Sequence, residues 1–135
     1  MAHDLRFVFV NGTFDVLHPG HIKLLNFAKS QGDYLTVAID STDRIRRLKG
    51  SSRPINSEAE RVFIIQNLRA VDRVVIFHTD EDLINLVSKC DVMVKGSDYR
   101  GKLIVGESEC KEILFYDIDD DYSTTKKIQD IISRG

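Results

Sequence analysis

Two histidines at a predicted helix start are the first candidates for chemistry. Residues 11–25, NGTFDVLHPGHIKLL, place His18 and His21 three positions apart. Because Pro19 suits the first position of a helix, His18 would be the cap and His21 would lie in the first turn. A helix start offers unpaired N–H groups and the positive end of a dipole, which favour phosphate. Two imidazoles there could stabilise the charge that grows on phosphoryl oxygens during a displacement.

Other interpretations of this segment stay open on spacing alone. The histidines could be solvated or hydrogen-bonded parts of the structure. They could also bind a metal ion, although no third ligand is evident nearby in the sequence. Gly12 would let the backbone approach a ligand closely, and Gly20 would keep the first helical turn free of a side chain.

Short apolar runs alternate with helical patterns along the chain. The apolar runs are 6–10, 34–39, 73–77, 91–96 and 112–118, and the helical patterns are 19–31, 57–69, 80–89 and the residues after 123. Apolar, β-branched runs with helices between them are typical of a buried parallel sheet. We therefore predict an α/β fold, a single doubly wound, Rossmann-like parallel sheet of about five strands, forming one domain over residues 1–135. Ligands bind such sheets at the carboxyl ends of the strands, where residues 11–17 would lie.

The composition excludes several classes of function. The 135 residues are 42% hydrophobic and 30% charged, which suffices for one core, and the net charge of −2 gives no sign of a nucleic-acid or membrane partner. No apolar run approaches the length of a membrane span, and the N-terminus lacks a secretory pattern. We therefore expect a cytoplasmic protein in which Cys90 and Cys110 are reduced thiols.

A basic stretch follows the second apolar run. Residues 44–53, RIRRLKGSSR, hold five bases and no acid. They could form a solvated loop or helix end. They could equally form a flexible clamp over a bound phosphate, since lysine and arginine both bind transferring phosphates.

Three later segments lie where the predicted sheet would meet a ligand. VKGSDY, residues 94–99, could be a surface turn or could present Lys95 and Asp98 to a substrate. YSTTKK, residues 122–127, could be a plain helix cap or a second phosphate site. DIDDDY, residues 117–122, reads as a solvated acidic loop, and we assign no metal ligands, because Mg²⁺ needs only one or two carboxylates beside phosphate oxygens.

The run GTFDVLHPGH resembles the GxFDxxHxGH signature of the cytidylyltransferase-like nucleotidyltransferase superfamily. The similarity extends over nearly the whole chain. RLKGSSRPIN, AVDRVV, VMVKGSDY and YSTTKKI occur in the same order in one branch, the heptose 1-phosphate adenylyltransferase domains. The glycerol-3-phosphate cytidylyltransferases are the next most similar branch.

This resemblance implies a dimeric, doubly wound nucleotidyltransferase that binds an NTP together with Mg²⁺. A sugar or polyol phosphate would attack the α-phosphorus in line, and pyrophosphate would leave without a covalent enzyme intermediate. Catalysis would depend on positioning and on neutralising charge.

The resemblance also implies roles for individual residues. His18 and His21 would contact the triphosphate and stabilise the transition state, and Asp15 would order the loop. Lys49 would reach the triphosphate or the acceptor phosphate, and Lys95 would bind the acceptor. Arg61 would also bind the acceptor, unless it is a surface residue of its helix. The nucleotide-binding set would be completed by Gly12, Thr13, Phe14, Gly20, Asp98, Ser123, Thr124 and Thr125.

The choice of substrates depends on smaller differences between the branches. The acidic run 117–122 lacks the arginine of the cytidylyltransferases, and this difference, like VKGSDY, favours ATP with heptose 1-phosphate or a related sugar 1-phosphate. Thr13 is closer to the cytidylyltransferase form, which keeps CTP with glycerol 3-phosphate as the alternative. A nucleotide-binding module without turnover is a further alternative.

Overall fold

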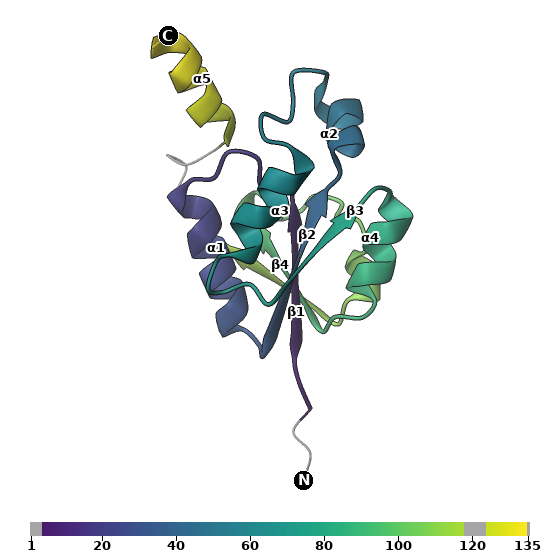
Figure 1. Ribbon diagram of the computed structural model, residues 1–135. Coiled ribbons are helices and arrows are strands. Elements are labelled where there is room, and N and C mark those ends of the chain that lie inside the picture. The colour runs from purple at the N-terminus through teal and green to yellow at the C-terminus, as the bar shows by residue number, and fades with distance from the viewer. Residues whose placement is uncertain (1–3, 118–123, 135) are drawn as a thin grey trace.

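A five-stranded parallel sheet lies at the centre of the computed structural model, which describes residues 4–117 and 124–134 (Figure 1). The strands are β1 (Phe7–Gly12), β2 (Tyr34–Asp40), β3 (Arg73–Phe77), β4 (Val92–Gly96) and β5 (Glu112–Tyr116). Their order is β3-β2-β1-β4-β5, and each neighbouring pair is parallel. The predicted α/β class and strand number are confirmed. Strands β2 and β3 are added on one side of β1, and β4 and β5 on the other, so the topological switch point lies between β1 and β4. Such folds bind ligands at the switch point.

Helices cover both faces of the sheet. The helices are α1 (Pro19–Ser30), α2 (Thr42–Lys49), α3 (Glu58–Gln66), α4 (Asp80–Val87) and α5 (Thr124–Arg134). Figure 1 shows α1 and α3 on one face, α4 on the other, and α5 beyond the end of the sheet where α1 begins. Within the described ranges, no helix has the length and apolar character needed to cross a bilayer.

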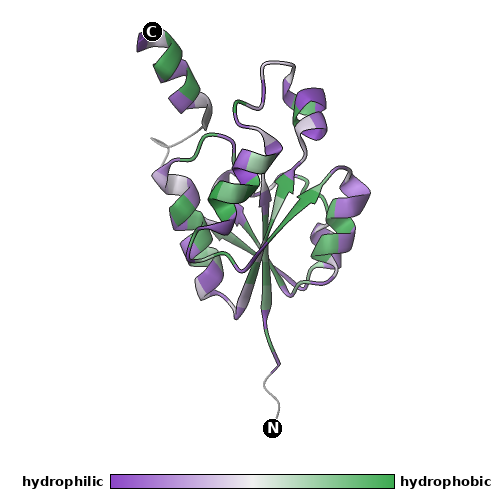
Figure 2. Ribbon diagram, in the orientation of Figure 1, coloured by the Kyte–Doolittle hydropathy of each residue, from purple (hydrophilic) through white to green (hydrophobic). Residues whose placement is uncertain are grey.

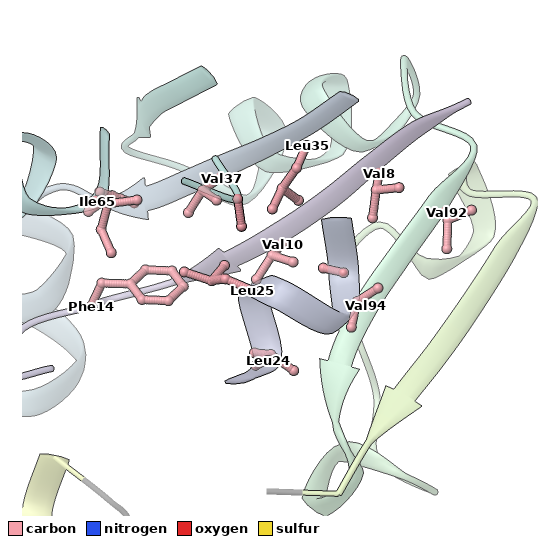
Figure 3. Packing of buried hydrophobic residues seen from close by; sticks show 13 residues of the cluster. Val8, Val10, Phe14, Leu24, Leu25, Leu35, Val37, Ile65, Val92 and Val94 are labelled. Atoms are coloured by element: carbon pink, nitrogen blue, oxygen red, sulfur yellow. The ribbon is translucent and has the colours of Figure 1, made fainter. Parts of the chain in front are cut away.

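Alternate residues of the strands fill two cores. Val8 and Val10 of β1 pack with Leu25 of α1 and Ile65 of α3, as Figure 3 shows at close range. Phe9, between the two valines, faces the opposite core beneath α4. This alternation follows from the two-residue period of a strand. It explains why the runs are apolar throughout: both faces are buried.

Two predicted helix starts hold in detail. Pro19 is the first residue of α1, with His18 at its cap position. Ser57 caps α3, where its Oγ accepts from the Glu60 N–H at 3.1 Å while the Ser57 N–H donates to the Glu60 carboxylate at 3.0 Å. These reciprocal bonds form a capping box at the start of α3.

Of the alternatives predicted for the basic stretch, the structure shows a helix end, with Arg46, Arg47 and Lys49 in the last turn of a helix. Residues 42–49 form α2, and the Ser41 Oγ caps it by accepting from the Arg44 N–H at 3.1 Å. Ile45 is the one buried residue of this helix, and most of the helix is hydrophilic (Figure 2). A short helix with a single apolar anchor is therefore held mainly by polar contacts.

Candidate active site

A cavity of about 430 Å³ lies at the carboxyl ends of β1, β2 and β4. Its wall includes the end of β1 and the following residues to Phe14, one face of α2, and residues 94–96, 98–99 and 103–105. Its volume falls within the range of small-molecule sites, and it occupies the position at which α/β sheets bind ligands. The cavity is therefore the candidate active site.

The two histidines stack on each other at the edge of this cavity. Their ring centroids are 3.8 Å apart with the planes inclined by 27°. His21 lies on the cavity wall, whereas His18 is 6% exposed and borders a neighbouring hollow beside Pro19 and Ile22. The His21 Nδ1 accepts a hydrogen bond from the His18 N–H at 3.1 Å. Neutral His21 therefore carries its proton on Nε2, where it can donate to a ligand.

Burial keeps both imidazoles uncharged near neutral pH. Burial, together with the charge of neighbouring His18, lowers the pKa of His21 to about 4. Burial also lowers the pKa of His18, and the positive charge of Lys127 adds to this effect. His21 would therefore stabilise an anion in the cavity as a hydrogen-bond donor rather than as a cation.

The loop between β1 and α1 contains a residue with left-handed backbone geometry and lines the cavity. Phe14 has a φ of 47°, which non-glycine residues seldom adopt, and its ring lies 5.6 Å from that of His21. A Cβ at Gly12 would come within 3.0 Å of the Phe14 ring. Gly12, Thr13 and Phe14 all line the cavity, whereas Gly20 is buried within α1.

Asp15 orders this loop, as predicted, and does not face the cavity. Its carboxylate accepts from the backbone N–H groups of Ile55 and Asn56 at 2.7 and 2.8 Å. The Asn56 side chain returns a hydrogen bond to the Asp15 carbonyl at 2.5 Å. These bonds join the loop after β1 to the segment before α3.

Lys95 brings a cation to the floor of the cavity. Its side chain is only 8% exposed, and its Nζ donates to the Asn11 Oδ1 at 2.8 Å and lies 4.7 Å from the centre of the Tyr99 ring. Burial lowers the pKa of Lys95 to about 8, against the opposing effect of Asp40 and Asp98. A bound anion would stabilise the protonated form of this buried ammonium group, because it would supply a neighbouring opposite charge.

One face of α2 contributes two further cations. Lys49, the last residue of the helix, is exposed and lines the cavity. Arg44 also lines it, but its guanidinium donates to Asp40 at 2.9 Å and to Asp80 at 2.7 Å and lies over the Phe77 ring. Lys49 is thus the more available cation for a ligand, and Arg44 ties α2 to β2 and α4.

Arg61 requires a correction of its predicted role in acceptor binding. Its side chain is 0% exposed and does not reach the cavity wall. Its guanidinium donates to the carbonyls of Thr13, Asp40 and Asn56 and to the Thr42 hydroxyl. The guanidinium nitrogens that could bind a phosphate are therefore already hydrogen-bonded to oxygens of the protein.

The remaining predicted residues divide between the cavity and α5. Asp98 lies on the cavity wall. Thr124 begins α5 and Thr125 is exposed in its first turn, but no described residue of α5 lines the cavity, and Ser123 lies outside the described residues. The influence of Lys127 on His18 indicates that α5 approaches α1. A second phosphate site on α5 stays a prediction.

Several cavity residues were missed by the sequence analysis. Asn11 and Asp40 end β1 and β2, so their place at the carboxyl edge was the available signal. Tyr99 belongs to the quoted VKGSDY segment. Nothing in the sequence indicated that Leu103 to Val105 would return to the cavity. In the described ranges, no three His, Cys, Asp or Glu side chains gather into a metal site.

Comparisons with known proteins agree with this geometry. The family model described as "Cytidylyltransferase-like" matches residues 9–131. The "Bifunctional protein HldE" of a Nitratiruptor species is 46% identical over 126 residues, which are 92% of this chain and 27% of the relative. The protein of the same name from Helicobacter pylori is 43% identical over 131 residues, 96% of this chain and 28% of the relative. The chain thus spans little more than a quarter of the curated relatives it matches.

A solved structure gives the same result for the fold. The lipopolysaccharide core biosynthesis protein from Thermoplasma volcanium superposes with a TM-score of 0.70 at 28% sequence identity. The match covers 86% of this chain and 100% of that one.

Proposed function

The chain belongs to the cytidylyltransferase-like family, and on that premise we propose that its cavity transfers a nucleoside monophosphate from an NTP to a sugar phosphate. ATP is the proposed donor and heptose 1-phosphate, or a related sugar 1-phosphate, the proposed acceptor. Pyrophosphate is the second product. Similarity to the HldE proteins at 43–46% identity supports the pairing of nucleotide with sugar phosphate.

One observation carries this proposal. A hydrogen-bond donor, His21, and two cations, Lys49 and Lys95, line a single cavity at the switch point of the sheet. Donors and cations that surround one anion-sized space suit a reaction in which negative charge moves between phosphoryl oxygens. The same wall contains apolar Leu103 and Ile104, against which a nucleobase could pack.

The proposed reaction needs no covalent enzyme intermediate. An oxygen of the sugar phosphate attacks the α-phosphorus, the bond to the oxygen bridging toward the β-phosphorus breaks, and pyrophosphate leaves with the electron pair. The Nε2–H of His21 donates to the α-phosphoryl oxygens, and stacking against His18 holds its ring in place. Lys49 and Lys95 attract the phosphates of the two substrates and hold them in line.

We expect Mg²⁺ to enter with the triphosphate. Magnesium binds phosphate oxygens and water together with only one or two carboxylates. Asp98 lies on the cavity wall and could supply one, whereas Asp40 is engaged by Arg44. When bound, the ion would neutralise negative charge on the phosphates. This donor set fits an ion carried by the substrate.

The resemblance also supports a homodimer that acts in the cytoplasm, where NTPs are made. Light scattering after gel filtration measures the first of these two properties. A monomeric mass at micromolar concentration would remove the dimer from the proposal but leave the reaction intact.

A coupled assay of pyrophosphate release tests the proposed reaction. The protein is incubated with Mg²⁺ and either ATP or CTP, each across a panel of sugar 1-phosphates and glycerol 3-phosphate. We expect the highest kcat/KM with ATP and a heptose or related sugar 1-phosphate. Preference for CTP with glycerol 3-phosphate would select the alternative suggested by Thr13. Nucleotide binding without pyrophosphate release for any pair would identify a non-catalytic module.

A further inference from the structure

Arg61 is a buried cation whose hydrogen bonds all go to neutral oxygens. Its Nη1 donates to the Asp40 and Thr13 carbonyls at 2.6 and 3.2 Å. Its Nη2 donates to the Thr42 Oγ1 at 3.1 Å, and its Nε donates to the Asn56 carbonyl at 3.3 Å. A single side chain thus joins three segments that are distant in the sequence.

Such a residue is costly as a purely stabilising element. Removing a guanidinium from water opposes its charge, and burial accordingly lowers the pKa of Arg61, although Asp15, Glu58 and Asp40 act in the opposite direction. A well-packed apolar side chain often stabilises a core as well or better than a buried charge. Stability of the core alone therefore does not explain why four protein oxygens hold a buried guanidinium at this position.

Each segment that Arg61 binds leads to the cavity. Thr13 belongs to the loop that lines the cavity between β1 and α1. Asp40 and Thr42 form the junction between β2 and α2, and α2 carries Lys49 to the cavity wall. Asn56 precedes α3, and its N–H donates to the carboxylate of Asp15, which belongs to the same loop after β1 as Thr13.

The start of α2 depends strongly on α3. The Thr42 N–H donates to the Glu58 carboxylate of α3 at 2.6 Å, and the Thr42 hydroxyl accepts from Arg61. Ile45 is the only buried residue of the eight in α2. Polar contacts from α3 therefore fix the start of the helix, while Arg44 and Arg47 bind it to Asp40, Asp80 and the His78 carbonyl further along.

We propose that Arg61 is a positioning residue that fixes α2 against the loop after β1, so that Lys49 and Thr13 face the same bound nucleotide. This inference rests on the proposed function for its effect on turnover, but its effect on α2 is independent of turnover. Arg61 touches neither substrate. It acts through four protein oxygens.

The hydroxyl of Thr42 offers a mild way to weaken this connection. Thr42→Val removes the acceptor for the Arg61 Nη2 with little change in shape, and Thr42→Ser keeps it as the matched control. Asp91→Ala is a second control, since the Asp91 carboxylate accepts from the Phe7 N–H at the opposite end of the sheet. Arg61→Lys keeps the charge but loses the planar fork, and the Thr42 pair decides the question if that variant does not fold.

Hydrogen exchange followed by mass spectrometry tests the positioning directly. We expect Thr42→Val to speed amide exchange in peptides covering 42–49 and 11–17, and Thr42→Ser and Asp91→Ala to leave those peptides unchanged. Equal protection of residues 42–49 in the Val and Ser variants would overturn the inference. This outcome is readable even if the protein shows no turnover with any NTP, which would refute the proposed function alone.

Steady-state kinetics tests whether the positioning reaches Lys49. Thr42→Val should lower kcat/KM by about fivefold to tenfold, the scale of losing one ordinary intramolecular hydrogen bond. In a Lys49→Ala background the same change should cost less than about twofold, because the residue being positioned is already gone. Additive losses in the double variant would show that Arg61 contributes stability without positioning Lys49.

Discussion

The stacked pair of His18 and His21 combines a structural and a chemical role at one helix start. The His21 Nδ1 is used by the His18 N–H, which leaves the Nε2 proton for the cavity. Because burial lowers the pKa of His21 to about 4, the ring is neutral at the pH at which NTPs are used. A neutral donor gains most when charge develops on the oxygen it contacts, and that preference for the transition state raises kcat.

Replacing either histidine should therefore lower turnover. We expect His21→Ala to reduce kcat by about tenfold to a thousandfold, the scale of removing one donor to a developing charge. His18→Ala should lower kcat as well, because it removes the ring that holds His21 in place. Pyrophosphate release under saturating substrates measures the loss. His78→Ala, which truncates an exposed histidine outside the cavity, is the matched control. Wild-type kcat in the His21 variant would remove that residue from the mechanism.

Lys95 gives the reaction a pH dependence. Its pKa of about 8 is lowered by burial, so the free protein loses this cation as the pH rises through about 8. Because only the protonated amine attracts phosphate, kcat/KM should fall on the alkaline side of that pH. Lys95→Arg, which stays charged, should abolish this alkaline decline even if its maximum is lower. An unchanged decline in Lys95→Arg would assign the titration to another group.

At the level of elements, α2 shows how a cation can be either structural or available. Arg44 points back to β2 and α4 through Asp40 and Asp80, whereas Lys49 is the exposed last residue of α2 at the cavity. The two residues lie on one short helix and differ chiefly in their partners. The helix is thus attached through Arg44 and Arg47 and offers the charge of Lys49 at its end.

Alanine substitutions should separate these two roles. Lys49→Ala should lower kcat/KM by about tenfold or more and leave Tm unchanged, because no interaction within the protein is lost at an exposed side chain. Arg44→Ala should lower Tm by several degrees, since it leaves two carboxylates without their partner, and should affect kcat/KM less. Calorimetry and pyrophosphate release on the same samples provide both values. Loss of activity greater for Arg44→Ala would indicate that the whole basic face binds substrate.

The sequence predicted the sheet well and α2 poorly, for physical reasons. Strands buried on both faces, as β1, β2 and β4 largely are, form continuous apolar runs, and the edge strands β3 and β5 are apolar enough to be recognised as well. In TDRIRRLK only Ile45 and Leu48 are apolar, which is too few for a helical period to be visible. The capping Ser41 was the available signal.

The sequence predicted those site residues that have a suitable side chain and also lie at the end of a strand. Lys95, Gly12 and Asp98 lie at or just after the ends of parallel strands, and parallel strands bring their carboxyl ends to one edge. Arg61 was mispredicted because most of its partners are backbone carbonyls, and those of Thr13 and Asp40 belong to distant segments. A sequence does not show which carbonyls a fold leaves without donors. Its residue type alone suggested phosphate.

The molecule as a whole is organised so that one edge of the sheet carries the chemistry. The order β3-β2-β1-β4-β5 places β1 centrally, with β2 and β4 on either side, and the cavity opens where these three strands end. Two separate cores beneath the helices support this edge from both faces. Ligand binding at the edge should therefore stabilise the entire fold.

Thermal unfolding measures this coupling between binding and stability. With Mg²⁺ and ATP at about one hundred times Kd, binding adds about 2.7 kcal/mol, which corresponds to a rise in Tm of roughly 5 to 15 °C for a chain of this size. CTP at the same concentration should produce a smaller rise, and Lys49→Ala should reduce the rise with ATP. A Tm that is raised more by CTP than by ATP would contradict the proposed base preference.

A crystal structure with Mg²⁺ and a non-hydrolysable ATP analogue tests the central claim most directly. We predict that the α-phosphate lies within hydrogen-bonding distance of the His21 Nε2, with Lys49 and Lys95 beside the phosphates in the cavity at the ends of β1, β2 and β4. A triphosphate bound elsewhere, with the cavity holding only solvent, would contradict the account.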